Sequence, residues 1–241
     1  MTLDRENDIM PNWCVTNMTF YSKDRDTLED FLKRIEEWIS TDKYSNKYRR
    51  QWFGRRWLGN VLYSLFGEKF VNEVIDKEEI SYRGYIAYLS DREEISYDEK
   101  SGYYSFIMDT ETAWIPHIKM WKLVLDKFYP NGKIKYAYVA NEPGCRINMI
   151  WDPDYVIRPS NDYKYVIEYY NEEDDECYDW RGEILDTNTA IKIIKELFNV
   201  DCSKYIDDVD RVNKEAQESF GKDEDLYFYF ALLDVCETED S

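Results

Sequence analysis

The sequence predicts an α+β protein in which a ferredoxin-like split βαβ core with an antiparallel sheet is extended by an acidic α/β C-terminal part. Three observations lead to this fold class. The predicted elements follow the order β-α-(insertion)-β-β-α-β, which is that of a split βαβ unit. Both helices of that unit carry one apolar stripe, as helices packed on a sheet do. No Pro/Gly-rich linker and no internal repeat interrupts the 241 residues.

The first strand and helix are predicted between residues 14 and 39. Residues 14–21 alternate in the two-residue period of a strand and are rich in β-branched and aromatic side chains. Asp24 is suited to cap the helix that follows. The apolar positions of that helix recur at helical spacing: Leu28, Phe31, Leu32, Ile35, Trp38 and Ile39.

An insertion follows this helix. Residues 40–53 are polar and basic, which predicts a loop. Apolar residues between 57 and 66 predict a short helix, bounded by Gly54 and Gly67.

The second half of the core contains strands at 80–89 and 102–109, of which the second is apolar on both faces, as a central strand would be. Pro116 is suited to the first turn of a helix at 115–129. The inward stripe of that helix is Trp114, Ile118, Trp121, Leu125 and Phe128. Turns at 131–132 and 142–144 then separate two more strands, at 134–138 and 145–151.

The C-terminal part is predicted to contain a strand at 163–170, a helix at 188–198, a charged helix at 203–219 and a strand at 226–235. We expect these elements to extend the sheet of the core instead of forming a separate domain.

Negative charge is concentrated in this C-terminal part. Residues 161–241 hold 24 Asp and Glu against 8 Lys and Arg, a balance of −16, whereas residues 1–160 hold 26 against 23, a balance of −3. Such a field repels nucleic-acid phosphate and attracts a basic partner. We therefore expect no direct binding of nucleic acid.

The cysteines and the hydropathy pattern predict a cytoplasmic protein. The five cysteines form no C-x-x-C pair, and their odd number speaks against a disulfide framework. No apolar run approaches the roughly 20 residues that span a bilayer, and the polar first ten residues do not resemble a signal peptide.

The motifs of catalysis and of metal or cofactor binding are missing from the sequence. His117 is the only histidine, and we interpret it as a surface or capping residue, with a role as a base as the alternative. No Cys/His cluster has the spacing of metal ligands and no glycine-rich phosphate loop is present. We expect a non-enzyme without a metal or cofactor.

Two groups of acidic residues are candidate partner-binding residues: Glu172, Glu173, Asp174, Asp175, Glu176, and then Asp207, Asp208 and Asp210. One interpretation is a solvated hairpin tip and a solvated helix surface. The other is a row of carboxylates that imitates nucleic-acid phosphates.

A basic island between residues 43 and 56 is the candidate site for a small ligand. Its candidate ligand-binding residues are Arg49, Arg50, Arg55, Arg56 and Trp52. Basic and aromatic side chains in alternation also bind single-stranded nucleic acid, but the net charge of the chain opposes this. The alternative is that these cations pair with the acidic part, within one molecule or across a homodimer.

Several short segments resemble the YubB ferredoxin-like (Api92-like) family of phage, plasmid and other mobile-element proteins. These segments are residues 10–14, 57–60, 82–84, 111–114 and 142–145, which read MPNWC, WLGN, YRG, ETAW and EPGC. The resemblance implies a ferredoxin-like fold and a mobile-element origin, and implies no established activity. It also implies that the folded part begins at Met10, so that residues 1–9 form a flexible extension. Together with the charge pattern, this divides the rest of the chain into a core at 10–151 and an acidic extension at 152–241.

These observations favour an interaction protein that inhibits a host nucleic-acid-binding defence protein, such as an anti-CRISPR protein, by phosphate mimicry in the host cytoplasm. The alternatives are a binder of a small ligand or nucleotide signal, acting as a sponge, and an enzyme of unknown chemistry.

Overall fold

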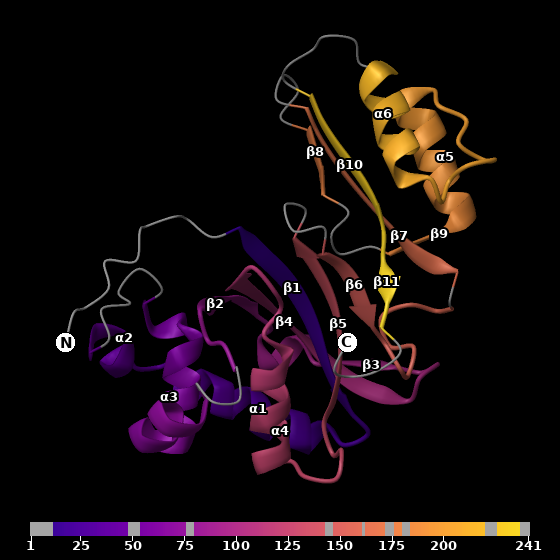
Figure 1. Cartoon of the computed structure of the whole chain (residues 1–241). Coiled ribbons are helices and arrows are strands. Elements are labelled where there is room, and N and C mark those ends of the chain that lie inside the picture. Colours follow the sequence, from indigo (N-terminus) through magenta and orange to yellow (C-terminus); the bar gives the residue numbers. More distant parts are fainter. Residues whose placement is uncertain are drawn as a thin grey trace, which may run out of the picture. The chain divides into compact units, whose positions relative to one another are not determined.

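The computed structural model describes residues 12–47, 54–75, 80–142, 147–160, 162–171, 176–179, 184–219 and 226–236. The chain divides into two compact units, Met1–Ile147 and Asn148–Glu239 (Figure 1). Both units combine helices with antiparallel strands, so the α+β class is confirmed.

The first unit is built on an antiparallel sheet of strands β5, β1, β4 and β2, in that spatial order. A short additional strand, β3, pairs with β4. The bounds of these strands are β1 Trp13–Ser22, β2 Gly84–Leu89, β3 Ser96–Asp98, β4 Tyr103–Ala113 and β5 Lys135–Glu142. As predicted, the strand apolar on both faces, β4, lies between two neighbours.

Helices α1 (Arg25–Trp38) and α4 (Ile118–Phe128) pack on the same face of this sheet. The ring of Phe20 on β1 lies 5.1 Å from that of Phe31 in α1 and 5.8 Å from that of Trp121 in α4. One strand residue that contacts both helices places them on one side, as their apolar stripes predict. The Asp24 side chain caps α1 by accepting a hydrogen bond from the backbone N–H of Asp26.

One residue of the predicted α4 stripe lies elsewhere. Trp114 precedes the helix with a φ of 72° and is 41 % exposed. A left-handed backbone is unfavourable for a residue with a Cβ atom. The chain leaves β4 in a bend at this point, because the Trp114 N–H donates to the Asn12 carbonyl instead of starting a helical turn.

The insertion contains more helix than the sequence predicts. A short helix, α2 (Lys43–Lys47), lies inside the stretch expected to be a loop, and residues 48–53 lie outside the described residues. The other elements are η1 (Gly54–Arg56), α3 (Leu58–Phe70) and η2 (Val71–Ile75). Gly67 interrupts α3 with a φ of 77°, a conformation that glycine adopts readily.

The second unit has a sheet of its own, in which β10, β7 and β8 are neighbours and β9 also pairs with β7. Its elements are β6 Ile147–Trp151, β7 Tyr163–Asn171, β8 Glu176–Asp179, β9 Leu185–Asp186, α5 Thr187–Phe198, α6 Val209–Ser219, β10 Leu226–Leu232 and β11 Asp234–Val235. Strand β11 pairs with β6 in parallel.

Helices α5 and α6 lie together on one face of this second sheet (Figure 1) and enclose a separate core. Phe198 of α5 lies 4.3 Å, between ring centroids, from Phe228 of β10. The prediction that strands 163–170 and 226–235 extend the first sheet is wrong for β7 and β10, which pair with each other around their own core. The last part of the predicted strand 226–235 forms β11, which pairs with β6 and not with β7. The unit boundary follows Ile147, before the predicted boundary at 151.

Among the described residues, no helix has both the length and the apolar character needed to cross a membrane.

Candidate functional site

Three of the predicted acidic contact residues, Asp207, Asp208 and Asp210, lie together where the chain enters α6. Asp207 Oδ1 accepts hydrogen bonds from the Tyr165 hydroxyl (2.7 Å) and from Lys164 Nζ (3.3 Å). The pKa of Asp207 lies below its usual range, mainly because of the hydrogen bond from Tyr165 and to a smaller extent because of Lys164. Its side chain nevertheless stays 67 % exposed.

The other two carboxylates act at the start of the helix. Asp208 Oδ1 accepts from the backbone N–H of Arg211 at 3.2 Å, which is the bond of a helix cap. Asp210 lies exposed in the first turn, where the helix dipole favours an anion. Neither carboxylate is within ion-pair distance of a described Lys or Arg. These two residues combine a local structural role with an accessible negative charge.

Other acidic residues of the two helices are largely neutralised by neighbours on the same helix. Glu215 pairs with Arg211 at 2.7 Å and also accepts a hydrogen bond from the Tyr205 hydroxyl. Glu218 lies 3.8 Å from Lys214. The described part of the acidic surface is therefore uneven: Glu215 and Glu218 have a cation nearby, whereas Asp208 and Asp210 have no described cation within ion-pair distance.

The other acidic candidates cannot be placed. Glu172, Glu173, Asp174 and Asp175 lie outside the described residues, and Glu176 is described only as the first backbone position of β8. Within the described part of the chain, no group of His, Cys, Asp and Glu is arranged to hold a metal ion.

The basic island is only partly described, because Arg49, Arg50 and Trp52 lie outside the described residues. Arg55 and Arg56 are exposed in η1, and Arg56 Nη1 donates to the Ala87 carbonyl at 2.8 Å. Lys47 forms an ion pair with Glu68 of α3. These described contacts lie within the first unit.

His117 is buried, not at the surface as expected. It is the N-cap position of α4 and is 6 % exposed, and its side chain makes no cap hydrogen bond. Burial lowers the pKa of His117 to about 4, although the Ala113 carbonyl acts weakly in the opposite direction. The imidazole is therefore neutral near pH 7.

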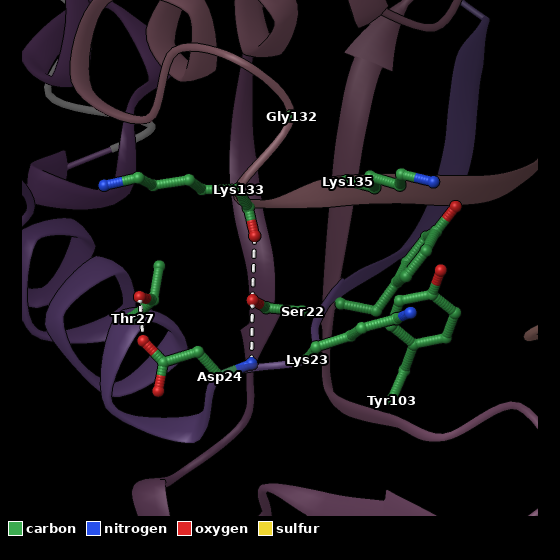
Figure 2. A pocket seen from close by; sticks show the side chains of 9 residues that line it. Ser22, Lys23, Asp24, Thr27, Tyr103, Gly132, Lys133 and Lys135 are labelled. Atoms are coloured by element: carbon green, nitrogen blue, oxygen red, sulfur yellow. Dashed lines mark hydrogen bonds between the residues drawn. The ribbon is translucent and has the colours of Figure 1, made fainter.

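A cavity of about 510 Å³ lies in the first unit, where β1 ends and β5 begins (Figure 2). Its lining residues are Tyr21, Ser22, Lys23, Asp24, Thr27, Tyr103, Gly132, Lys133 and Lys135. The floor is formed by the buried Tyr21 and Ser22, and the three lysines are exposed. This volume lies within the range of small-molecule sites, about 300–1,000 Å³.

Hydrogen bonds fix the walls of this cavity. The Ser22 hydroxyl donates to the Lys133 carbonyl at 2.7 Å and accepts from the Asp24 N–H at 3.1 Å (Figure 2). The Asp24 carboxylate in turn accepts from the Thr27 hydroxyl at 2.5 Å. The start of α1 and the start of β5 are thus joined through a single serine.

Sequence reasoning missed the lysines of this cavity. Lys133 and Lys135 are two residues apart at the start of a strand, after the Asn131-Gly132 turn. Residues at this spacing lie on the same face of a strand, so the sequence could have predicted that the two lysines are neighbours. Their proximity to Lys23 follows from the pairing of β1 with β5, which sets Tyr21 opposite Lys135.

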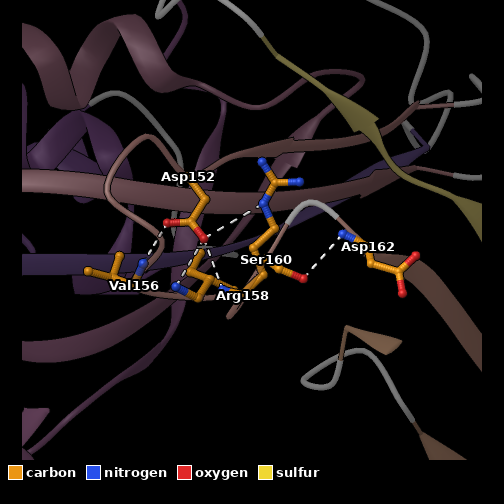
Figure 3. A network of polar contacts seen from close by, with 6 residues as sticks. Asp152, Val156, Arg158, Ser160 and Asp162 are labelled. Carbon is orange, nitrogen blue, oxygen red and sulfur yellow. Dashed lines mark hydrogen bonds and ion pairs between the residues drawn. The ribbon is translucent and has the colours of Figure 1, made fainter. Parts of the chain in front are cut away.

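A second polar network, in the second unit, is structural in character (Figure 3). The buried Asp152 accepts hydrogen bonds from the backbone N–H groups of Val156 (2.8 Å), Ile157 (3.2 Å) and Arg158 (2.9 Å). The Arg158 side chain, also buried, reaches back to within 3.9 Å of the same carboxylate. This network fixes the turn that leads from β6 toward β7.

Three of the segments that resemble the YubB-like family are neighbours at one end of the first sheet. Trp13 is paired with Ala113, and Gly84 with Thr112. A Cβ atom on Gly84 would lie 2.4 Å from the Glu111 carbonyl oxygen, so this close approach requires glycine. Comparison of the chain with protein-family models, with curated proteins and with solved structures returns no match.

Proposed function

We propose that this chain is a mobile-element protein that inhibits a host nucleic-acid-binding defence protein, such as a CRISPR effector, by presenting carboxylates in place of phosphates. The observation that carries the proposal is the charge of −16 in residues 161–241, with Asp207, Asp208 and Asp210 exposed together at the start of α6.

The mechanism is occlusion. A protein that grips nucleic acid presents Lys and Arg side chains to phosphates, and a cluster of carboxylates satisfies the same cations. The net charge of −19 also attracts a basic partner from a distance and raises the rate of association. Asp208 and Asp210 are suited to this role because both are exposed and no described Lys or Arg lies within ion-pair distance of either carboxylate.

Two features support a ferredoxin-like fold and a mobile-element origin. The strand order β5-β1-β4-β2, with α1 and α4 on one face, is the arrangement expected of a ferredoxin-like split βαβ unit. Three of the segments that resemble the YubB-like family, within 10–14, 82–84 and 111–114, are neighbours in that sheet. We accordingly propose a site of action in the host cytoplasm.

The test is a triple substitution, Asp207→Asn, Asp208→Asn and Asp210→Asn, in a tagged protein expressed in a bacterium that carries a DNA-targeting defence system. Asn is also a good helix cap, so α6 should persist. A matched control, Glu37→Gln, Glu93→Gln and Glu99→Gln, removes the same charge from exposed positions of the first unit.

We expect the partner that is recovered with the wild-type protein at low salt to be lost at high salt. Its association with the triple variant should be slower by about tenfold or more, while the control stays close to wild type. Equal association rates for both variants would contradict the proposal, and so would tight binding of a DNA or RNA probe by the wild-type protein at physiological salt.

A further inference from the structure

We infer that the cavity between the end of β1 and the starts of β4 and β5 is a binding site for a small phosphate-bearing ligand with more than one anionic group. This site lies in the first unit, and its lining includes no residue of the candidate acidic residues or of the basic island. The inference is independent of the proposed inhibitory function.

The first argument is local charge. Three lysines and one aspartate line the cavity, a balance of +2 within a chain of net charge −19. The aspartate, Asp24, is engaged by the N–H of Asp26 and the hydroxyl of Thr27. Neither Lys23 nor Lys133 has a described carboxylate within ion-pair distance. The ammonium groups of Lys23 and Lys133 are therefore available to an external anion.

The second argument is the arrangement of the cations. Lys23 Nζ and Lys135 Nζ lie 5.7 Å and 5.9 Å from the centre of the Tyr103 ring. Lys133 extends in the opposite direction in Figure 2. Because the ammonium groups do not meet at one point, one phosphate cannot contact all three. An anion with several charged groups, such as a diphosphate or triphosphate, can use more than one of these lysines.

The third argument is preorganisation. The bond from Ser22 to the Lys133 carbonyl fixes the segment that carries Lys133, and strand pairing fixes Lys135 opposite Tyr21. The Tyr103 ring packs edge-on against that of Tyr21 at 5.0 Å. The backbone of the site is thus held before a ligand arrives, which lowers the entropic cost of binding.

The Tyr103 ring lines the cavity but is not assigned a role in binding a nucleotide base. Both flanking ammonium groups and the Tyr21 ring already contact Tyr103, so the ring is surrounded by protein groups on several sides. We therefore assign recognition to the phosphate groups, which nucleotides and inorganic polyphosphates share.

The test is isothermal titration of the full-length protein with three probes at constant ionic strength: inorganic tripolyphosphate, adenosine triphosphate and adenosine. Binding of both phosphate compounds, without binding of adenosine, is the expected result. A triphosphate nucleotide that binds more tightly than tripolyphosphate would identify a nucleotide as the ligand, and equal affinities would identify the polyphosphate group alone.

Variants locate the site. The triple variant Lys23→Gln, Lys133→Gln and Lys135→Gln should weaken tripolyphosphate binding by about a hundredfold or more, since each substitution removes a charge-assisted hydrogen bond to a phosphate oxygen. The control Lys33→Gln, Lys100→Gln and Lys119→Gln removes the same charge from exposed positions. The variant Arg55→Gln with Arg56→Gln tests the basic island instead.

The inference is overturned if no phosphate probe binds the wild-type protein, if the lysine control loses as much affinity as the cavity variant, or if only the Arg55 and Arg56 variant loses affinity. Circular dichroism of each variant checks that the fold is retained. Loss of binding in a well-folded cavity variant, with intact controls, supports the site.

Discussion

At the scale of single residues, His117 shows how the fold changes the chemistry of a side chain. A lone histidine beside a proline at a helix start is usually accessible to solvent. Here the fold buries it to 6 % exposure, and burial lowers its pKa to about 4 from the ordinary value of 6.5. The folded protein therefore favours the neutral ring.

This burial predicts a pH dependence of stability. Between about pH 6.5 and pH 4 the unfolded chain binds a proton at His117 that the folded protein does not, so stability falls as the pH is lowered through this window. The shift corresponds to about 3 kcal/mol in total. Urea denaturation of the wild type and of His117→Gln, whose side chain does not titrate, isolates this contribution.

The expected result is that the difference in stability between the wild type and the variant changes by up to about 3 kcal/mol across this window and is constant above pH 7. A difference that stays constant from pH 7 to pH 4 would show that the imidazole is accessible to solvent in the folded protein.

At the scale of elements, β10 shows how an edge strand is protected. It lies at the end of its sheet and contains no charged residue, which would make its edge prone to pairing with another chain. Asn213 of α6 covers one position of this edge. Its side-chain amide donates to the Phe230 carbonyl at 2.8 Å and accepts from the Phe230 N–H at 2.9 Å. Asn213 thus substitutes for a neighbouring strand.

We expect Asn213→Ala to destabilise the protein by about 1–3 kcal/mol, because the buried N–H and C=O of Phe230 lose their partner. Chemical denaturation measures this loss, and sedimentation velocity should show increased self-association of the variant. The control is Asn188→Ala, at an exposed position of α5. If the two alanine variants are equally stable, the edge is not sealed by Asn213.

At the scale of the whole molecule, charge is distributed unevenly between the units. The acidic segment 161–241 belongs almost entirely to the unit with α5 and α6, whereas the unit with α1 and α4 is nearly neutral and contains the lysine cavity. A chain can therefore present an anionic surface and a cationic site at the same time.

The excess of 50 acidic over 31 basic residues predicts that salt stabilises the protein. Self-repulsion opposes the compact state, and screening shortens its reach from about 30 Å at 0.01 M to about 8 Å at 0.15 M ionic strength. The melting temperature measured by circular dichroism should rise over this range, equally in sodium and potassium chloride. A falling melting temperature would mean that the ion pairs of the surface outweigh the repulsion.

The sequence by itself determined the elements whose signals are local. The apolar stripe of α1, the stripe of α4 apart from Trp114, the alternation of β1 and the cap at Asp24 were predicted correctly. The Asn131-Gly132 turn was also predicted, and both of its residues have positive φ, near 68°. These features depend on neighbours within a few residues, so the periodicity of the chain is enough to reveal them.

Only the tertiary structure decided the rest. The short strands β3, β8 and β9 exist because a longer strand offers them hydrogen bonds, and the second sheet forms because β7 pairs with β10, about 60 residues further along the chain. The lysine cavity likewise requires β1 and β5 to meet in one register. Such pairings depend on the free energy of contacts between distant segments, which local periodicity does not contain.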